Sequence, residues 1–215
     1  MTPWPAWDGN DFEDLPNLIK AQGKTTTDHI SPAGPWLKLR GHLDKFSDNL
    51  LSGGTNAFTD EPGTAINVLG NKGTDTVANV ARIYKAAGRK WVIVGDANYG
   101  EGSSREHAAL SPRLLGGVAV IAKSFARIHE ANLKKQGLLA LTFQNPDAYD
   151  SLGAEARLNL TGLDDLAPGK PVTCTVRRAD GSTDTLRLNH TFSESQLGWF
   201  RSGSAVNLFN QSQAA

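Results

Sequence analysis

Short apolar runs alternate with helix-like segments through the middle of the chain. The runs lie at 91–94, 118–122 and 138–143, and each is apolar on both faces of the strand it predicts. The segments between them, 104–115 and 125–135, are predicted helices that stop at Gly116 and Gly137. Strands that are apolar on both faces are typical of a parallel sheet covered on both sides. The pattern therefore predicts a strand–helix–strand–helix–strand unit with right-handed crossovers.

The flanking segments follow other patterns. A further helix is predicted at 76–87, where apolar residues recur at helical spacing and a glycine supplies the stop. In the last third, alternating apolar and polar residues predict short strands at 157–160, 171–178 and 183–188, then a short helix near 193–201 and a polar tail. We expect these late elements to extend the same domain.

The first third of the chain has few periodic signals. Residues 1–23 predict a lead-in with a short apolar strand near 18–21, and residues 24–75 form a long stretch rich in Gly, Pro, Asn and Thr. Loops of this length in a compact domain are usually functional or mobile. We therefore expect a lead-in at 1–23 and one α/β domain over 24–215, in which helices cover a mostly parallel sheet and short strands and a helix follow.

Composition narrows the class of protein. The 215 residues suffice for one domain with a sizeable core, and 22 basic residues balance 22 acidic ones. A neutral chain gives no support for a nucleic-acid partner, and the lack of an apolar run of about 18 residues predicts no membrane span. The N-terminus lacks the basic start and the apolar core of a signal peptide.

Cysteine content sets the sharpest limit on cofactor chemistry. Cys174 is the only cysteine, so an intramolecular disulfide and an all-cysteine metal or iron–sulfur site within this chain are both excluded. It lies in the alternating run 172–176, which indicates a packed structural thiol rather than a reactive one. No residue of the chain is predicted as a metal ligand.

The segment after the first apolar run carries the strongest chemical signal. Gly100 and Gly102 permit backbone conformations and close approaches that side chains forbid. Ser103 with Glu106 has the spacing of a capping box, and free amides at a helix N-terminus attract anions. Arg105 adds a planar fork that suits a carboxylate. A well-capped helix would explain the serines alone, but the combination predicts an anion site.

The serine in such a site can be assigned one of two roles. A Ser–His–Asp triad fits poorly, because no nucleophile elbow is present and His107 lies four residues on along the same predicted helix. A serine held among helix amides and an arginine could instead act as a general base on a C–H next to a carboxylate. That reaction needs an electrophile to expel hydroxide, and the chain offers no evident metal cluster for it.

Further candidates stay open on the residues alone. Asp28 and His29 could bind a metal, but two adjacent ligands without partners favour turn chemistry and exposed charge. Arg40 stands between a short apolar stretch and a glycine, so it either points into a cleft or lies on the surface. His129 is on a predicted helix, where a surface position or a supporting position behind the site is expected.

Stretches along nearly the whole chain match a known family. They are Lys24 with residues 26–31, 34–38 and 40–43, and residues 98–106, 123–130, 132–139, 188–192 and 199–201. These stretches resemble the C-terminal swivel domain of mitochondrial-type aconitases, and the resemblance implies a swivel-type α/β domain. It also implies a hydro-lyase that isomerises citrate and isocitrate through cis-aconitate, with a [4Fe–4S] cluster that binds the substrate.

Carried onto matching positions, the resemblance gives four residues a role. It implies that Ser103 is the catalytic base, that Ser104 and Arg105 contact substrate carboxylates, and that Arg40 clamps another carboxylate. The family's cluster cysteines and catalytic His/Asp pairs lie in preceding domains that have no equivalent here. The resemblance therefore implies cluster ligands outside this chain, partner domains in cis or in trans, and no turnover by the isolated chain.

Two alternatives to an enzyme domain remain. One is a stand-alone swivel domain that binds a polycarboxylate or a protein partner without activity of its own. The other is the small subunit of a homoaconitate or isopropylmalate hydratase, which resembles this chain less because such enzymes handle different side groups where Arg40 would lie. A mitochondrial matrix location is implied by the resemblance, and a cytoplasmic one if the chain is bacterial or a truncated paralogue.

Overall fold

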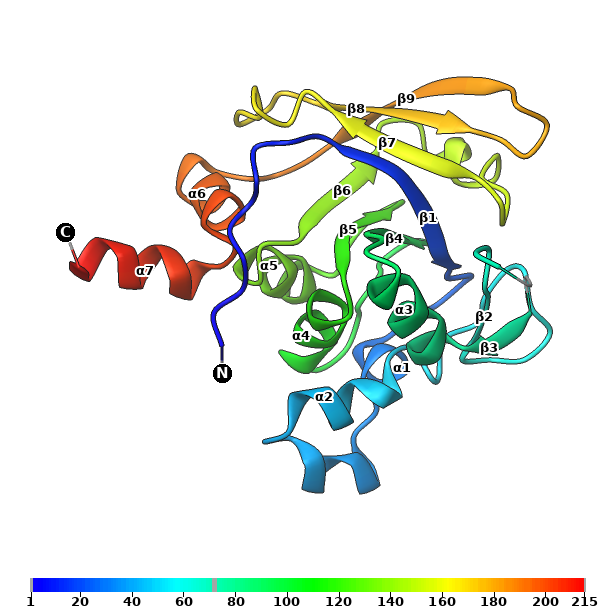
Figure 1. Cartoon of the computed structure of the whole chain (residues 1–215), viewed down its shortest axis with the longest axis horizontal. Coiled ribbons are helices and arrows are strands. Elements are labelled where there is room, and N and C mark those ends of the chain that lie inside the picture. Colours follow the sequence, from blue (N-terminus) through cyan, green and yellow to red (C-terminus); the bar gives the residue numbers. More distant parts are fainter. Residues whose placement is uncertain (1, 71–72, 215) are drawn as a thin grey trace.

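The computed structural model describes residues 2–70 and 73–214, and its centre is a closed barrel of seven strands (Figure 1). The strands are β1 Phe12–Lys20, β4 Trp91–Gly95, β5 Gly117–Ala122, β6 Leu139–Phe143, β7 Arg157–Thr161, β8 Val172–Arg177 and β9 Thr183–Asn189. They follow the order β1-β4-β5-β6-β9-β8-β7. β1, β4, β5 and β6 pair in parallel, while β7, β8 and β9 pair antiparallel. The predicted α/β fold with added C-terminal strands is confirmed.

The longer helices lie outside the parallel strands (Figure 1). They are α3 Val77–Ala86, α4 His107–Leu114, α5 Arg127–Lys135, α6 Glu194–Ser202 and α7 Ala205–Ala214. The expected polar tail is wrong, because α7 follows α6 after a left-handed Gly203 and packs against it. None of the helices in the described part of the chain is long and apolar enough to cross a membrane.

The long Gly- and Pro-rich stretch holds several short elements that its sequence pattern did not indicate. They are α1 Thr27–Ile30, the 3₁₀ turn η1 Gly34–Leu39, α2 Leu43–Phe46, η2 Ser47–Asn49, and the antiparallel pair β2 Thr64–Ile66 and β3 Thr74–Thr76. A last 3₁₀ turn, η3, spans Pro146–Tyr149. Elements this short carry too few residues for a readable period, and tertiary contacts hold them in place.

Alternation along the parallel strands divides the interior into two cores. Val92 and Val94 of β4 pack inside the barrel, whereas Trp91 and Ile93 pack outside it with α3 and α4. α3, α4 and α5 therefore cover the outer face, while Leu197 and Phe200 of α6 join the core inside the barrel. Both faces of the sheet are covered, as predicted, but β7 pairs antiparallel with β1 and closes the sheet, so opposing strands enclose the inner face.

β1 lies within the segment expected to be a lead-in. It pairs in parallel with β4, where Asn17 is opposite Val92, and antiparallel with β7, where Leu15 is opposite Leu158. Leu15 is fully buried in the barrel core. Removing residues 12–20 would open the barrel between two strands. We therefore propose that the domain begins before β1 rather than at residue 24.

Cys174 lies on β8 with its side chain inside the barrel core. Burial raises the pKa of its thiol to about 12, so the sulfur stays protonated and unreactive near neutral pH. This position agrees with the packed structural thiol that the alternating pattern predicted.

Candidate active site

The loop that follows β4 is shaped by residues in left-handed conformations. Asn98, Gly100 and Gly102 have φ values of +54°, +83° and +109°. A Cβ atom at Gly100 would lie 2.2 Å from Cδ2 of His129, a distance no real contact allows. Glycine is thus required at position 100 both by the backbone angle and by the ring that packs against it.

Residues from the long N-terminal stretch brace this loop. The amide of Gly100 donates to the carbonyl of Thr25, and the amide of Thr27 donates to the carbonyl of Glu101, both at 2.8 Å. The hydroxyl of Thr27 donates to the carbonyl of Ser103 at 2.7 Å. The loop is therefore held by a segment that lies about 75 residues earlier in the chain.

The bracing explains why the expected capping box is absent. α4 begins at His107 with Glu106 as the N-cap residue, and no side chain caps it. Because Thr27 holds the carbonyl of Ser103, the chain stays non-helical through Arg105. The prediction that Ser103 and Glu106 cap a helix starting near residue 104 is therefore wrong. The hydroxyls of Ser103 and Ser104 stay exposed and available to a ligand.

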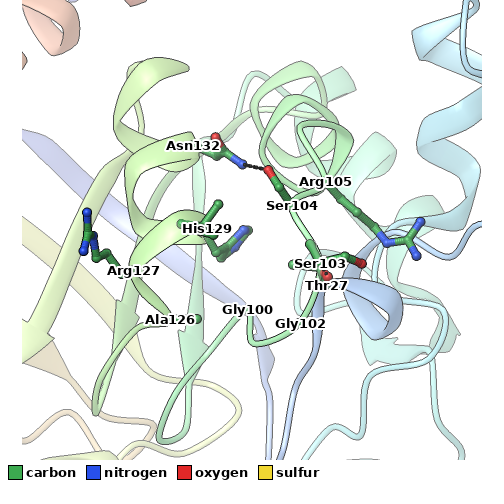
Figure 2. A pocket seen from close by; sticks show the side chains of 11 residues that line it. Thr27, Gly100, Gly102, Ser103, Ser104, Arg105, Ala126, Arg127, His129 and Asn132 are labelled. Atoms are coloured by element: carbon green, nitrogen blue, oxygen red, sulfur yellow. Dashed lines mark hydrogen bonds between the residues drawn. The ribbon is translucent and has the colours of Figure 1, made fainter.

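Ser103, Ser104 and Arg105 line one cavity of about 500 Å³. Figure 2 shows the loop on one side of this cavity and α5 on the other. The other lining residues are Thr27, Gly100, Gly102, Ala126, Arg127, Ile128, His129 and Asn132. The structure thus brings together three of the four residues that the sequence assigned to a carboxylate site.

Arg40, the fourth residue, lines an adjoining cavity of about 250 Å³ that also contains Ser104 and Arg105. Its side chain is exposed, and its carbonyl accepts a hydrogen bond from Nε2 of His107 at 3.0 Å. The His107 ring in turn stacks on Phe46 of α2, with centroids 4.3 Å apart. The predicted site therefore spans two cavities that share Ser104 and Arg105.

Arg105 has a fixed partner in the ligand-free chain. Its guanidinium forms an ion pair with Asp28 of α1, and its side chain is 23% exposed. His29 does not join a metal site with Asp28, because its Nδ1 accepts from the amide of Thr26 at 3.1 Å in a capping box. Within residues 2–70 and 73–214, no group of three or more His, Cys, Asp or Glu could hold a metal ion.

α5 contributes two residues: Asn132, which the sequence did not single out, and His129, which was expected at the surface or in a supporting position behind the site. His129 is 1% exposed, and neither of its ring nitrogens has a partner among the described residues. Asn132 donates from Nδ2 to Oγ of Ser104 at 3.3 Å, as the dashed line in Figure 2 marks. His129, Asn132 and Leu133 are buried at helical spacing, which could have indicated that His129 faces inward rather than to the surface.

Acid is expected to destabilise the fold through His129. Burial lowers the pKa of its imidazole to about 4, below the value of about 6.5 in an unfolded chain. The stabilising contribution of the neutral ring is therefore complete above about pH 6.5 and is lost as the pH falls towards 4, with a total of about 3 kcal/mol. Urea unfolding at several pH values should show a smaller acid loss for His129→Gln than for the unchanged chain. Identical pH dependence in both would contradict the assignment.

Comparison with known proteins gives consistent matches. The family described as Aconitase C-terminal domain matches residues 15–146. The chain is similar to "Aconitate hydratase, mitochondrial" of Gracilaria gracilis, with 61% identity over 96% of this chain and 26% of that protein. The protein of the same name from Saccharomyces cerevisiae is 54% identical, with the same coverage. The chain thus spans about a quarter of the length of the curated relatives it matches.

A solved structure matches the fold over both chains. It is 3-isopropylmalate dehydratase from Methanocaldococcus jannaschii, with a TM-score of 0.63 and 21% sequence identity. The match covers 95% of this chain and 96% of that one. At this identity the likeness extends to the fold alone.

Proposed function

Because this chain belongs to the Aconitase C-terminal domain family, we propose that it supplies the catalytic base and the carboxylate clamp of an aconitate hydratase. That enzyme would interconvert citrate and isocitrate through cis-aconitate. The observation that carries the proposal is the meeting of Ser103, Ser104 and Arg105 in one cavity, with Arg40 in the cavity beside it. A polycarboxylate needs several cationic or donor groups at once, and this arrangement offers them.

Ser103 is proposed to remove a proton from the carbon next to a substrate carboxylate. Its hydroxyl has no hydrogen-bond partner among the described residues, so it is free to face the substrate. A serine becomes a base only where its alkoxide is stabilised, and Arg105 on the same loop is the nearest cation in sequence to do so. The proton taken from carbon would then reside on Oγ of Ser103.

The neighbouring contacts orient the clamp. Asp28 holds the guanidinium of Arg105, which fixes a planar fork before the substrate arrives. Asn132 donates to Oγ of Ser104, which leaves the Ser104 hydroxyl proton free to donate to a carboxylate oxygen. Arg40 would bind a further carboxylate from the adjoining cavity. Each group therefore has a role in binding or orientation that needs no cofactor held by this chain.

The residues of this chain do not fit a [4Fe–4S] cluster. Such clusters are held by several thiolates, and the one cysteine, Cys174, is protonated inside the barrel core. We therefore propose that the electrophile that accepts hydroxide is held by polypeptide outside this chain, and that the isolated chain does not turn over. The names of the relatives support a mitochondrial location for the complete enzyme.

A second candidate is a separate subunit that docks onto a larger partner. The solved dehydratase chain is covered over 96% of its length, so a whole separate chain can consist of this fold. This candidate shares the cavity and its carboxylate clamp. It differs only in whether the partner domains are joined covalently.

The proposed function can be tested by reconstitution. The part of the Gracilaria gracilis relative that this chain does not cover would be produced separately, mixed with the chain, and assayed for conversion of citrate to isocitrate. We expect turnover from the mixture and none from either part alone, because each holds only some of the active-site groups. A stable, metal-loaded complex of the two parts without turnover would contradict the proposal.

A further inference from the structure

The cavity has a second polar wall that the proposed function leaves without a role. It is formed by residues 126–129 at the start of α5, facing the loop of Ser103 (Figure 2). No side chain caps α5, because its N-cap residue is Ala126, whereas Thr76 caps α3 and Ser193 caps α6. The first amides of a helix have no partner within it and attract anions.

The buried imidazole of His129 is an independent sign of a missing ligand. It lies in the first turn of α5, lines the same cavity, and has two unpartnered nitrogens at 1% exposure. Its ring is held against Gly100 and lies 5.5 Å from the ring of Tyr99, so it is not free to turn towards bulk solvent. Buried polar groups without partners are rare in proteins, since each loses its bonds to water.

The imidazole of His129 would bind a ligand as a neutral hydrogen-bond donor rather than as a positive charge. Burial lowers the pKa of His129 to about 4, so the imidazole is neutral near pH 7 and carries one N–H donor. The wall therefore offers backbone amides and an imidazole N–H, both of which suit an oxygen anion.

We propose that the N-terminus of α5, together with His129, is a second carboxylate subsite that faces the loop of Ser104 and Arg105. It rests on the proposed function and adds a substrate contact to it: one carboxylate of a polycarboxylate would lie at α5 while another lies at Arg105. A cavity of about 500 Å³ is in the size range that encloses small ligands. The ring nitrogens are closed off from solvent in the ligand-free chain, so the proposal requires the loop of Ser103 to move when a ligand contacts them.

The sharpest test caps α5 with a neutral side chain. In Ala126→Asn the side-chain oxygen of the new asparagine would accept hydrogen bonds from the free backbone N–H groups of α5. It would strengthen the helix and compete with the ligand without adding charge. In the reconstituted enzyme we expect KM for citrate to rise about tenfold or more, with kcat changed less, since charge-assisted hydrogen bonds are lost. The matched control, Thr76→Asn, replaces one N-cap residue by another on α3, away from the cavity, and should leave KM unchanged.

A second variant addresses the imidazole itself. His129→Phe keeps an aromatic ring against Gly100 and removes both nitrogens, and it should also raise KM. If Ala126→Asn leaves KM unchanged, the subsite is wrong while the proposed function stands. If the start of α5 has only a structural role, Ala126→Asn should stabilise the helix and leave KM unchanged, so a raised KM distinguishes the subsite from that role.

A binding measurement on the 215-residue chain separates the subsite from the proposed function. Backbone amide resonances of residues 127–129 would be followed by NMR while citrate, or inorganic phosphate at equal ionic strength, is added. Saturable shifts with citrate that Ala126→Asn abolishes would support the subsite even if the reconstituted enzyme does not turn over. Equal shifts with phosphate, or no shifts together with an unchanged KM, would overturn it.

Discussion

Ser103→Ala is expected to lower the turnover of the reconstituted enzyme by roughly two decades or more, because removing a base from the reacting carbon costs about that much. The substitution removes only the Oγ atom of Ser103. This side chain is exposed, and its hydroxyl has no hydrogen-bond partner among the described residues. The carbonyl that Thr27 holds is retained, so the loop should keep its shape. Citrate should therefore still bind, with KM changed far less than kcat.

The controls for this variant separate chemistry from assembly. Ser212→Ala removes a hydroxyl from exposed α7 and should leave turnover unchanged. Size-exclusion chromatography should show the same complex for Ser103→Ala as for the unchanged chain. Retained turnover in a correctly assembled Ser103→Ala enzyme would exclude Ser103 as the base and leave Arg105 and Arg40 as a binding clamp only.

Gly100→Ala is expected to destabilise the chain by roughly 2–5 kcal/mol. A left-handed backbone costs a residue with a Cβ about 1–2 kcal/mol, and forcing an extra carbon into a packed site costs about 1–3 kcal/mol more. Both conditions hold at Gly100, which has a φ of +83° and would place its Cβ 2.2 Å from the His129 ring. The bonds that join the loop to Thr25 should weaken with it.

Gly181 provides a matched control for that variant. It also has a φ of +83°, but a Cβ there would have nothing within 4 Å. Gly181→Ala therefore measures the backbone cost alone, and urea unfolding of both variants isolates the clash. Gly100→Ala should also cost less free energy of unfolding when it is introduced into the His129→Ala variant than when it is introduced into the unchanged chain, because the clashing ring is then absent. Equal destabilisation by the two glycine substitutions would contradict the close packing of His129 on Gly100.

The sequence predicted the regular parts of the fold well. The runs at 91–94, 118–122 and 138–143 correspond to β4, β5 and β6, because strands buried on both faces leave a continuous apolar signal. α3 and α5 were found within two residues of their bounds. Barrel closure was not predicted, since the pairing of β7 with β1 joins segments about 140 residues apart and leaves no local pattern.

In the site, too, local features were predicted from the sequence and long-range contacts were not. The local motif predicted an anion site at Ser103, Ser104 and Arg105, and the structure places these three consecutive residues on the wall of one cavity. The start of α4 was misplaced because the side chain that decides it, Thr27, comes from another part of the chain. Asp28 was weighed as a metal ligand or as an exposed charge in a turn, and its pairing with Arg105 depends on the same long-range contact.

The sequence by itself determined the residue types: a glycine-rich loop with two serines and an arginine, apolar runs for a parallel sheet, and a single cysteine that limits cofactor chemistry. Tertiary structure alone decided which groups share the cavity. It placed His129 and Asn132 of α5 opposite the loop, and it put Arg40 in a separate, adjoining cavity. The reason is physical: local propensity acts within a few residues, whereas a binding site forms where barrel closure and burial bring distant segments together.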